Sequence, residues 1–326
     1  MSYTWQNVLR VYKSCDNNDH FLKSYVSIKP GSDGILRNTD LRESTDQVAE
    51  LTELYKKGQL ITSRIGIVES SFLCKYVFNF PVVDHLKTTP ETVDKWMRTN
   101  AGLYYTDPQR KIDVLDWWCR ITIDVIRNSV YTASYNFLNN DLCLLANMNM
   151  KGVFYNYGHL YKLILQNSEG QRLLYIGNAV DSVRAAYARG LGAVWKFPVS
   201  TFELDCIKTP QTTEGMPMPN ETMIETCEAL QKEIVARSNF TTAILGCGAY
   251  GPPLINFIRT NFPGKNAIYL GSDCFKMFGI TVPNWKWEGS PPCSNEVNHE
   301  HLMHVLESLP EGCKRHPEKK YWNLNS

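Results

Sequence analysis

Residues 241–262 read TTAILGCGAYGPPLINFIRTNF and join an apolar run, a glycine-rich turn and an amphipathic segment. The apolar run predicts a buried strand. Pro252 and Pro253 suit the first turn of a helix, where the N–H that proline lacks would have no partner within the helix. Gly246, Gly248 and Gly251 lie in the turn. Strand, glycine turn and helix in this order are typical of loops that bind dinucleotides or phosphates, although close packing explains such glycines about equally well.

Two further segments have the same strand, turn and helix pattern. The first is QLITSRIGIVES, residues 59–70, and the second is QRLLYIGNAVDSVRAAYARGL, residues 171–191. We expect AVWKFPV, residues 193–199, to follow the second as a parallel strand, and NAIYLGSD, residues 266–273, to follow the opening stretch. Strands that alternate with helices predict an α/β, Rossmann-like, doubly wound fold, with a mostly parallel sheet, helices on both faces and an irregular C-terminal tail.

The composition changes along the chain suggest three parts. Residues 1–57 are predicted to form a helical and loop extension, and residues 58–290 an α/β catalytic domain with halves at about 58–165 and 171–290. Residues 291–326 are predicted to form a tail that wraps around the domain. Trp285, Trp287 and Trp322 suit either stacking on sugar rings or packing against the body of the protein.

The bulk composition excludes several classes of partner. The formal net charge of +1 gives no overall attraction to nucleic acid or to an anionic membrane. Ten cysteines without a CxxC pair are typical of reduced thiols. The longest apolar runs fall short of the roughly 20 residues that cross a bilayer. We therefore expect a soluble cytoplasmic protein without a membrane span and without a nucleic-acid partner.

The turns after the predicted strands carry the candidate catalytic groups. Ligands of doubly wound sheets bind beyond the carboxyl ends of the strands. Arg64 and Glu69 follow the first strand, and Asp181 follows the strand of residues 171–177. Backbone amides at residues 247–251 and the helix dipole behind them suit a diphosphate.

The stretch from residue 242 to residue 280 resembles the GT-D-type glycosyltransferase-like family of capsular, cell-surface and large-virus glycan systems. The matching residues are Gly248, Tyr250, Gly251, Gly264, Lys265, Ala267, Ile268, Gly271, Phe278, Gly279 and Ile280. Arg64, Gly66 and Glu69 match the family's first turn, and the match spans about residues 60–285. Ile67 stands where well-understood members carry the first acid of an Asp-x-Glu pair.

The resemblance implies a glycosyltransferase that uses a nucleotide sugar, most simply a UDP-sugar, and a glycan acceptor. Glu69 is then the base or a metal contact, and Arg64 neutralises the leaving phosphate. The nucleotide-sugar site would comprise Gly66, Asn178, Asp181, Gly246, Gly248, Ala249, Tyr250, Gly251, Lys265 and Asp273. Because only one acid remains in the first turn, we assign no residue as a metal ligand, and the sequence leaves open whether Mn²⁺ or Mg²⁺ takes part.

Two other functions remain open from the sequence. Asp273 follows Gly251 at the spacing of a carboxylate that binds a ribose hydroxyl, which suits an enzyme that uses NAD or S-adenosylmethionine. The loss of the acid at Ile67 also fits a non-catalytic, glycan-binding relative of the transferases. Binding of uridine diphosphate, NADH and S-adenosylmethionine would separate these hypotheses.

Overall fold

A computed structural model describes residues 28–30, 36–38, 45–66, 68–69, 72–73, 94–133, 152–154, 157–213, 215–281 and 296–307. Ile67, Trp285, Trp287 and Trp322, which bear on the predictions above, lie outside these residues. Within the described part of the chain, every helix is too short or too polar to span a lipid bilayer.

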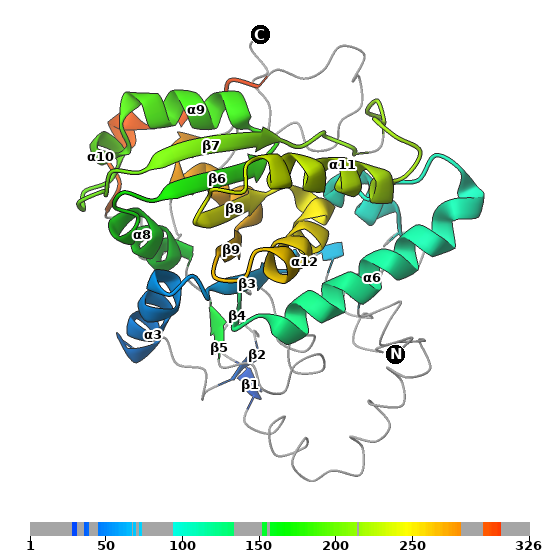
Figure 1. The fold of residues 1–326 in the computed structure, drawn as a ribbon, viewed down its shortest axis with the longest axis horizontal. Coiled ribbons are helices and arrows are strands. Elements are labelled where there is room, and N and C mark those ends of the chain that lie inside the picture. The colour runs from blue at the N-terminus through cyan, green and yellow to red at the C-terminus, as the bar shows by residue number, and fades with distance from the viewer. Residues whose placement is uncertain are drawn as a thin grey trace.

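The body of the protein is a seven-stranded sheet in which all neighbouring strands are parallel. The strand order is β5-β4-β3-β9-β8-β6-β7 (Figure 1). The strands are β3 (Ile61–Arg64), β4 (Tyr131–Ala133), β5 (Gly152–Phe154), β6 (Arg172–Gly177), β7 (Glu203–Lys208), β8 (Thr242–Gly246) and β9 (Asn266–Tyr269). The parallel sheet, with the helices described next on both of its faces, confirms the predicted α/β, Rossmann-like fold.

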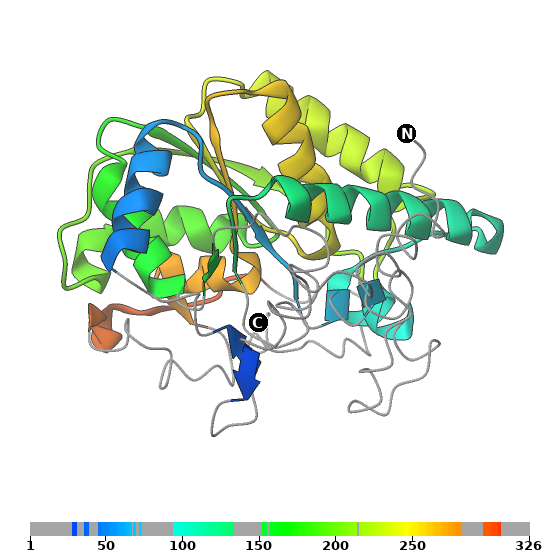
Figure 2. The same ribbon diagram turned by 90° about the horizontal axis from the view of Figure 1, so that it is seen from below.

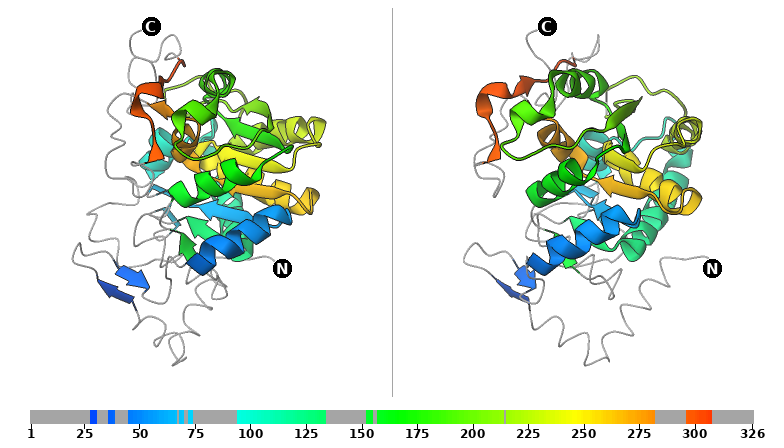
Figure 3. Two further views of the ribbon diagram at one scale, coloured as in Figure 1. Left: turned by 90° about the vertical axis from the view of Figure 1, so that its left-hand side faces the viewer. Right: turned by 60° about the vertical axis from the view of Figure 1, so that its left-hand side comes forward.

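Helices follow most of the strands. They are α3 (Thr45–Lys56), α6 (Lys111–Asn128), α8 (Tyr157–Asn167), α9 (Val180–Arg189), α10 (Leu191–Val194), α11 (Met223–Ala236), α12 (Gly251–Asn261) and α13 (Cys274–Met277). Shorter helical turns are η2 (Met97–Ala101), η3 (Pro108–Arg110), η4 (Gly248–Tyr250), η5 (Gly271–Asp273) and η7 (His299–His301). Two small pairs, β1 (Ile28–Pro30) with β2 (Leu36–Asn38) and β10 (Ile280–Thr281) with β11 (Met303–His304), lie outside the large sheet (Figure 3).

Alternation along the strands builds one core on each face of the sheet. In β6, Leu174 and Ile176 pack with α6, α11 and α12, which lie together on one side in Figure 2. Leu173 and Tyr175, one residue out of step, pack with α3, α8, α9 and α13. Successive side chains of a strand point to opposite faces, so this apolar run of β6 is buried on both sides.

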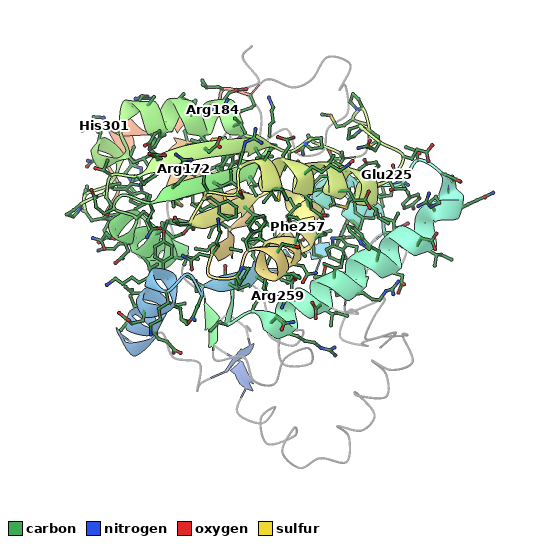
Figure 4. The ribbon with its side chains drawn as sticks, in the orientation of Figure 1. Arg172, Arg184, Glu225, Phe257, Arg259 and His301 are labelled. Atoms are coloured by element: carbon green, nitrogen blue, oxygen red, sulfur yellow. The ribbon has the colours of Figure 1, made fainter. Side chains whose placement is uncertain are left out.

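Charged groups tie the outer helices together at the protein surface. Arg259 of α12 forms an ion pair of 2.9 Å with Asp124 of α6 (Figure 4). Surface pairs of this kind contribute little to stability, so the apolar contacts between α6 and α12 are the main attachment.

The strand order brings both halves of the chain into one sheet. β3 pairs with β9 through Ile61 and Ala267, although about 200 residues separate these strands in the chain. The strands β4 and β5, which follow β3 in the chain, extend the sheet on one side of β3. On the other side, the late strands β9 and β8 lie between β3 and the earlier strands β6 and β7. Because all the strands are parallel, the turns after β3, β6, β7, β8 and β9 meet at one edge.

One local prediction is wrong. Residues 193–199 are not a strand of the sheet: α10 includes Leu191–Val194, and Trp195 stacks on Phe197 at 5.1 Å in the core. The edge strand is β7 instead, ten residues further on at Glu203. Apolar side chains fill the core here from a backbone conformation that local pattern does not distinguish.

The segments on either side of the predicted domain contact its core. Tyr55 of α3 is buried, and its carbonyl oxygen accepts a hydrogen bond of 2.9 Å from Asn266 of β9. At the other end, residues 296–307 lie along α9 and α10 (Figure 3). Glu307 accepts hydrogen bonds from the backbone N–H and the hydroxyl of Ser182, in the first turn of α9.

Candidate functional site

A cleft of about 380 Å³ opens at the carboxyl edge of the sheet. Its lining comes from the turns after β3, β6, β7, β8 and β9 and from the end of η2. This volume lies within the range of small-molecule sites. The cleft therefore lies where ligands bind in open α/β sheets, and both halves of the chain contribute to it.

Arg64 and Glu69 line the same cleft as Gly246, Gly248 and Tyr250. Arg64 is the last residue of β3, and Glu69 lies in the turn that follows. The pairing of β3 with β9, and of β9 with β8, brings this turn close to the glycine turn after β8. The two groups of residues that the sequence selected from distant parts of the chain thus come together.

Arg64 lies in an ion-pair network at the floor of the cleft. Its Nη2 is 3.7 Å from a carboxylate oxygen of Asp273, and Lys276 Nζ is 3.2 Å from the other oxygen. The guanidinium also occupies the space beside Gly271, where a Cβ atom would lie 2.0 Å from Nη1. A larger residue at this position would displace Arg64, so Gly271 shapes the cationic part of the cleft. The network leaves Asp273 engaged by two cations rather than open to a ribose hydroxyl.

Glu69 has a similar relation to Gly66. The Glu69 side chain folds back over this glycine, where a Cβ atom would lie 2.0 Å from Oε2. Glu69 is only 8 % exposed, and among the described residues it is the one carboxylate that lines the cleft. A buried carboxylate in a ligand cleft is suited to accept a proton from a bound hydroxyl group.

The glycines of the 246–251 turn serve packing. A Cβ atom on Gly246 would lie 2.8 Å from the Gly271 carbonyl oxygen, and one on Gly251 would lie 2.5 Å from the Tyr269 ring. Gly248 has a φ of +55° and would place a Cβ atom 2.6 Å from the Ala101 carbonyl oxygen. Close packing against the protein's own atoms therefore explains these three glycines, and Gly246 and Gly248 still line the cleft.

The rest of this turn is held by internal hydrogen bonds. The Ala249 carbonyl oxygen accepts a bond of 2.8 Å from the Trp118 indole N–H. The Tyr250 hydroxyl is 2.8 Å from Thr212 Oγ1. Burial raises the pKa of Tyr250, so its hydroxyl stays neutral. Ala249 is fully buried, and Tyr250 lines the cleft as a fixed wall.

Asn178 lies in the cleft as predicted, and it pairs with a residue that the sequence analysis missed. Its Nδ2 donates a hydrogen bond of 3.0 Å to Oε1 of Gln211. Gln211 belongs to the segment TPQTTEGMPMPN, which is rich in proline and polar residues and does not itself indicate a site. Its position shortly after a parallel strand, β7, was the signal that could have identified it.

The structure does not bring Asp181 or Lys265 to the cleft. Asp181 is exposed on α9 and pairs with Lys208 at 3.4 Å. Lys265 precedes β9 and therefore lies at the amino edge of the sheet, opposite the cleft. Its ammonium donates to the Ser238 carbonyl oxygen and lies 4.3 Å from the Phe240 ring centroid. The predicted contact between Lys265 and a phosphate is inconsistent with this position.

The described part of the cleft offers one carboxylate to a divalent metal ion. Magnesium and manganese are held by one or two carboxylates together with phosphate oxygens. Glu69 is the single carboxylate among the described lining residues, and Asp273 is already paired with two cations. The described residues include no group of three or more His, Cys, Asp or Glu side chains arranged to bind a metal.

Two cysteines line the cleft but are unsuited to nucleophilic catalysis. Cys247 and Cys274 are both buried. Burial raises the pKa of each thiol well above its ordinary value, so both stay protonated at neutral pH. The thiolate is the reactive form of cysteine. Glu69 and Arg64 are therefore the candidate reactive groups of the cleft.

The fold and the cleft define a Rossmann-like α/β protein with a cleft at the carboxyl edge of its sheet. Comparisons with protein-family models, with curated proteins and with solved structures found no match to this chain. The chemistry of the site is therefore argued from its residues.

Proposed function

We propose that this protein is a glycosyltransferase that moves a sugar from a nucleotide sugar to a glycan acceptor. The main supporting observation is the presence of Arg64 and Glu69 at one end of a cleft that crosses several strands. The GT-D-type resemblance of the first turn and of the 242–280 stretch is in accord with this proposal.

Each group has a defined role in the proposed reaction. The bond between the anomeric carbon and the phosphate oxygen breaks, and its electron pair leaves with the nucleoside diphosphate. Arg64 stabilises this developing negative charge. An acceptor hydroxyl forms the new glycosidic bond, and its proton moves to the Glu69 carboxylate. With Glu69 as a base, the acceptor attacks from the side opposite the leaving group and the anomeric configuration inverts.

The alternatives receive less support from the same site. An NAD or S-adenosylmethionine enzyme needs a carboxylate that is open to the ribose, and Arg64 and Lys276 already engage Asp273. A glycan-binding protein without activity would retain the cleft but would release no nucleoside diphosphate from any donor.

The test is release of nucleoside diphosphate from a panel of nucleotide sugars in the presence of glycan acceptors. We expect Glu69→Gln to lower kcat at least about a hundredfold with little change in KM, as for loss of a general base. Asp181→Asn is the matched control, because Asp181 is an exposed acid outside the cleft. Full activity of the Glu69→Gln variant, or no turnover of any donor by the native chain, would contradict the proposal.

A further inference from the structure

The end of the cleft opposite Arg64 and Glu69 carries two neutral amides. Asn178 follows β6 and Gln211 follows β7, and both line the cleft and are partly buried. We call these two side chains, joined by the 3.0 Å hydrogen bond, the amide pair. They carry no charge and therefore suit a neutral part of a ligand.

The backbone around Gln211 is held at both ends. The Thr209 N–H donates a hydrogen bond of 2.9 Å to the Gly177 carbonyl oxygen at the end of β6. Thr212 Oγ1 donates a bond of 2.6 Å to the Gly102 carbonyl oxygen, and Thr209 and Thr212 are each 2 % exposed. Gln211 thus lies on a fixed segment that crosses the edge of the sheet. A segment whose backbone is already fixed loses little entropy when one of its residues binds a ligand.

The amide pair retains hydrogen-bonding capacity toward the cleft. Once Asn178 Nδ2 donates to Gln211 Oε1, the Asn178 oxygen and the Gln211 amino group remain. Among the described residues, no other side-chain hydrogen bond engages these two groups. Exchange of oxygen and nitrogen in both amides would again leave one donor and one acceptor side by side. Adjacent donors and acceptors are what the hydrogen-bonding edge of a nucleobase requires.

The distance between the two ends fits a ligand with several linked groups. β3 and β6 are separated by β9 and β8, which is three strand spacings. At about 4.8 Å each, the ends lie about 14 Å apart. A free sugar or a phosphate would occupy only one end. A nucleotide sugar has a neutral base at one end, a reactive sugar at the other, and a diphosphate between them.

We infer that the amide pair binds the base of the donor nucleotide. The base then lies at the β6 and β7 end of the cleft, and the transferred sugar lies beside Glu69 at the β3 end. This inference rests on the proposed function, and it adds the direction of the donor in the cleft and the residues that recognise its base.

The test measures binding of two probes, uridine diphosphate and inorganic pyrophosphate, by calorimetry on the full chain. Gln211→Met and Asn178→Leu remove hydrogen bonds while keeping side-chain volume. We expect each variant to weaken uridine diphosphate binding about tenfold, the effect of one lost hydrogen bond, and to leave pyrophosphate binding unchanged. Gln109→Met is the matched control, because Gln109 is exposed outside the cleft.

A second variant keeps the test informative if the apolar substitutions unfold the loop. Gln211→Glu replaces the amino donor with an acceptor. The ratio of the affinities for uridine diphosphate and cytidine diphosphate should therefore change by at least about tenfold. Equal losses for uridine diphosphate and pyrophosphate, or an unchanged base preference in every variant, would overturn the inference and leave the proposed function standing. If the native chain binds neither uridine diphosphate nor pyrophosphate, the inference and the proposed function are both overturned.

Discussion

At the scale of single residues, the glycines separate into those that shape the cleft and those that pack the core. Gly271 has a φ of +58° and lies under the Arg64 guanidinium, whereas Gly248 lies against the Ala101 carbonyl oxygen. Gly170 has a φ of +66°, and no atom lies within 4 Å of the position that a Cβ atom would take. Gly170→Ala therefore measures only the free-energy cost of a left-handed backbone conformation. These three positions allow the two roles to be tested against a common reference.

Gly271→Ala should weaken donor binding without a large excess loss of stability. The substitution costs about 1–2 kcal/mol for the left-handed backbone, as Gly170→Ala does, and the new methyl group displaces the flexible end of Arg64. Uridine diphosphate affinity and thermal unfolding should be measured for both variants. If Gly271→Ala binds the nucleotide as tightly as the native chain, Arg64 does not contact the diphosphate.

Gly248→Ala should destabilise the fold more than Gly170→Ala. Both glycines have positive φ, but the Cβ atom at Gly248 would meet a backbone carbonyl oxygen at 2.6 Å, and backbone cannot move as a side-chain end does. Urea unfolding of the two variants gives the comparison. Equal losses would show that the turn after β8 has room for a methyl group and that close packing does not explain Gly248.

At the scale of elements, a carboxylate in the first turn of α11 accepts hydrogen bonds from the backbone N–H groups just before the helix. Glu225 Oε2 accepts hydrogen bonds from the N–H groups of Glu221 and Thr222 at 3.0 and 3.1 Å (Figure 4). Helix starts leave several N–H groups without intrahelical partners, and such contacts fix where the helix begins. The same helix presents Cys227 and Leu230 to the core of the sheet.

Glu225→Ala should lower the free energy of unfolding by about 1 kcal/mol. Glu228→Ala is the control, because Glu228 is exposed one turn further along the helix. Chemical unfolding of both variants should show a loss for Glu225→Ala alone. A matching loss in the two variants would mean that helix propensity or charge, rather than the capping contact, decides the effect.

At the scale of the whole molecule, buried cysteine thiols make the free energy of unfolding change with pH in the alkaline range. Burial raises the pKa of Cys206 from its ordinary 9.0 to about 11, and it raises the pKa of Cys227, Cys247 and Cys274 as well. These thiols stay protonated in the folded chain at pH values where the unfolded chain has already lost their protons. Stability is therefore complete below about pH 9 and falls as the pH rises.

The urea midpoint should be constant from pH 7 to about 8.5 and should then decrease steadily toward pH 11. Cys206→Ala should reduce the slope between pH 9.0 and about 11, the interval between its ordinary and its folded pKa. Circular dichroism at each pH gives the midpoint. A flat profile through this interval would show that the thiols ionise equally in both states.

Local pattern predicted part of this protein well because it reports periodicity and turn chemistry. The runs at β6 and β8 are apolar and end in glycines, so the strands and the helices after them are evident in the chain. Residues 193–199 were assigned wrongly, since short apolar runs suit either conformation and tertiary packing decides between them. The prediction that Lys265 belongs to the nucleotide-sugar site is wrong because Lys265 precedes β9 and lies at the amino edge of the sheet.

By itself, the sequence determined the α/β class and the selection of Arg64, Glu69 and Asn178 as residues after parallel strands. These are properties of neighbours in the chain, and parallel strands place the residues after them at one edge. Only the tertiary structure decided that β9 lies beside β3, that the glycines after β8 pack against protein atoms, and that Gln211 joins Asn178. Strand order and close contacts depend on residues far apart in the chain, which local periodicity does not encode.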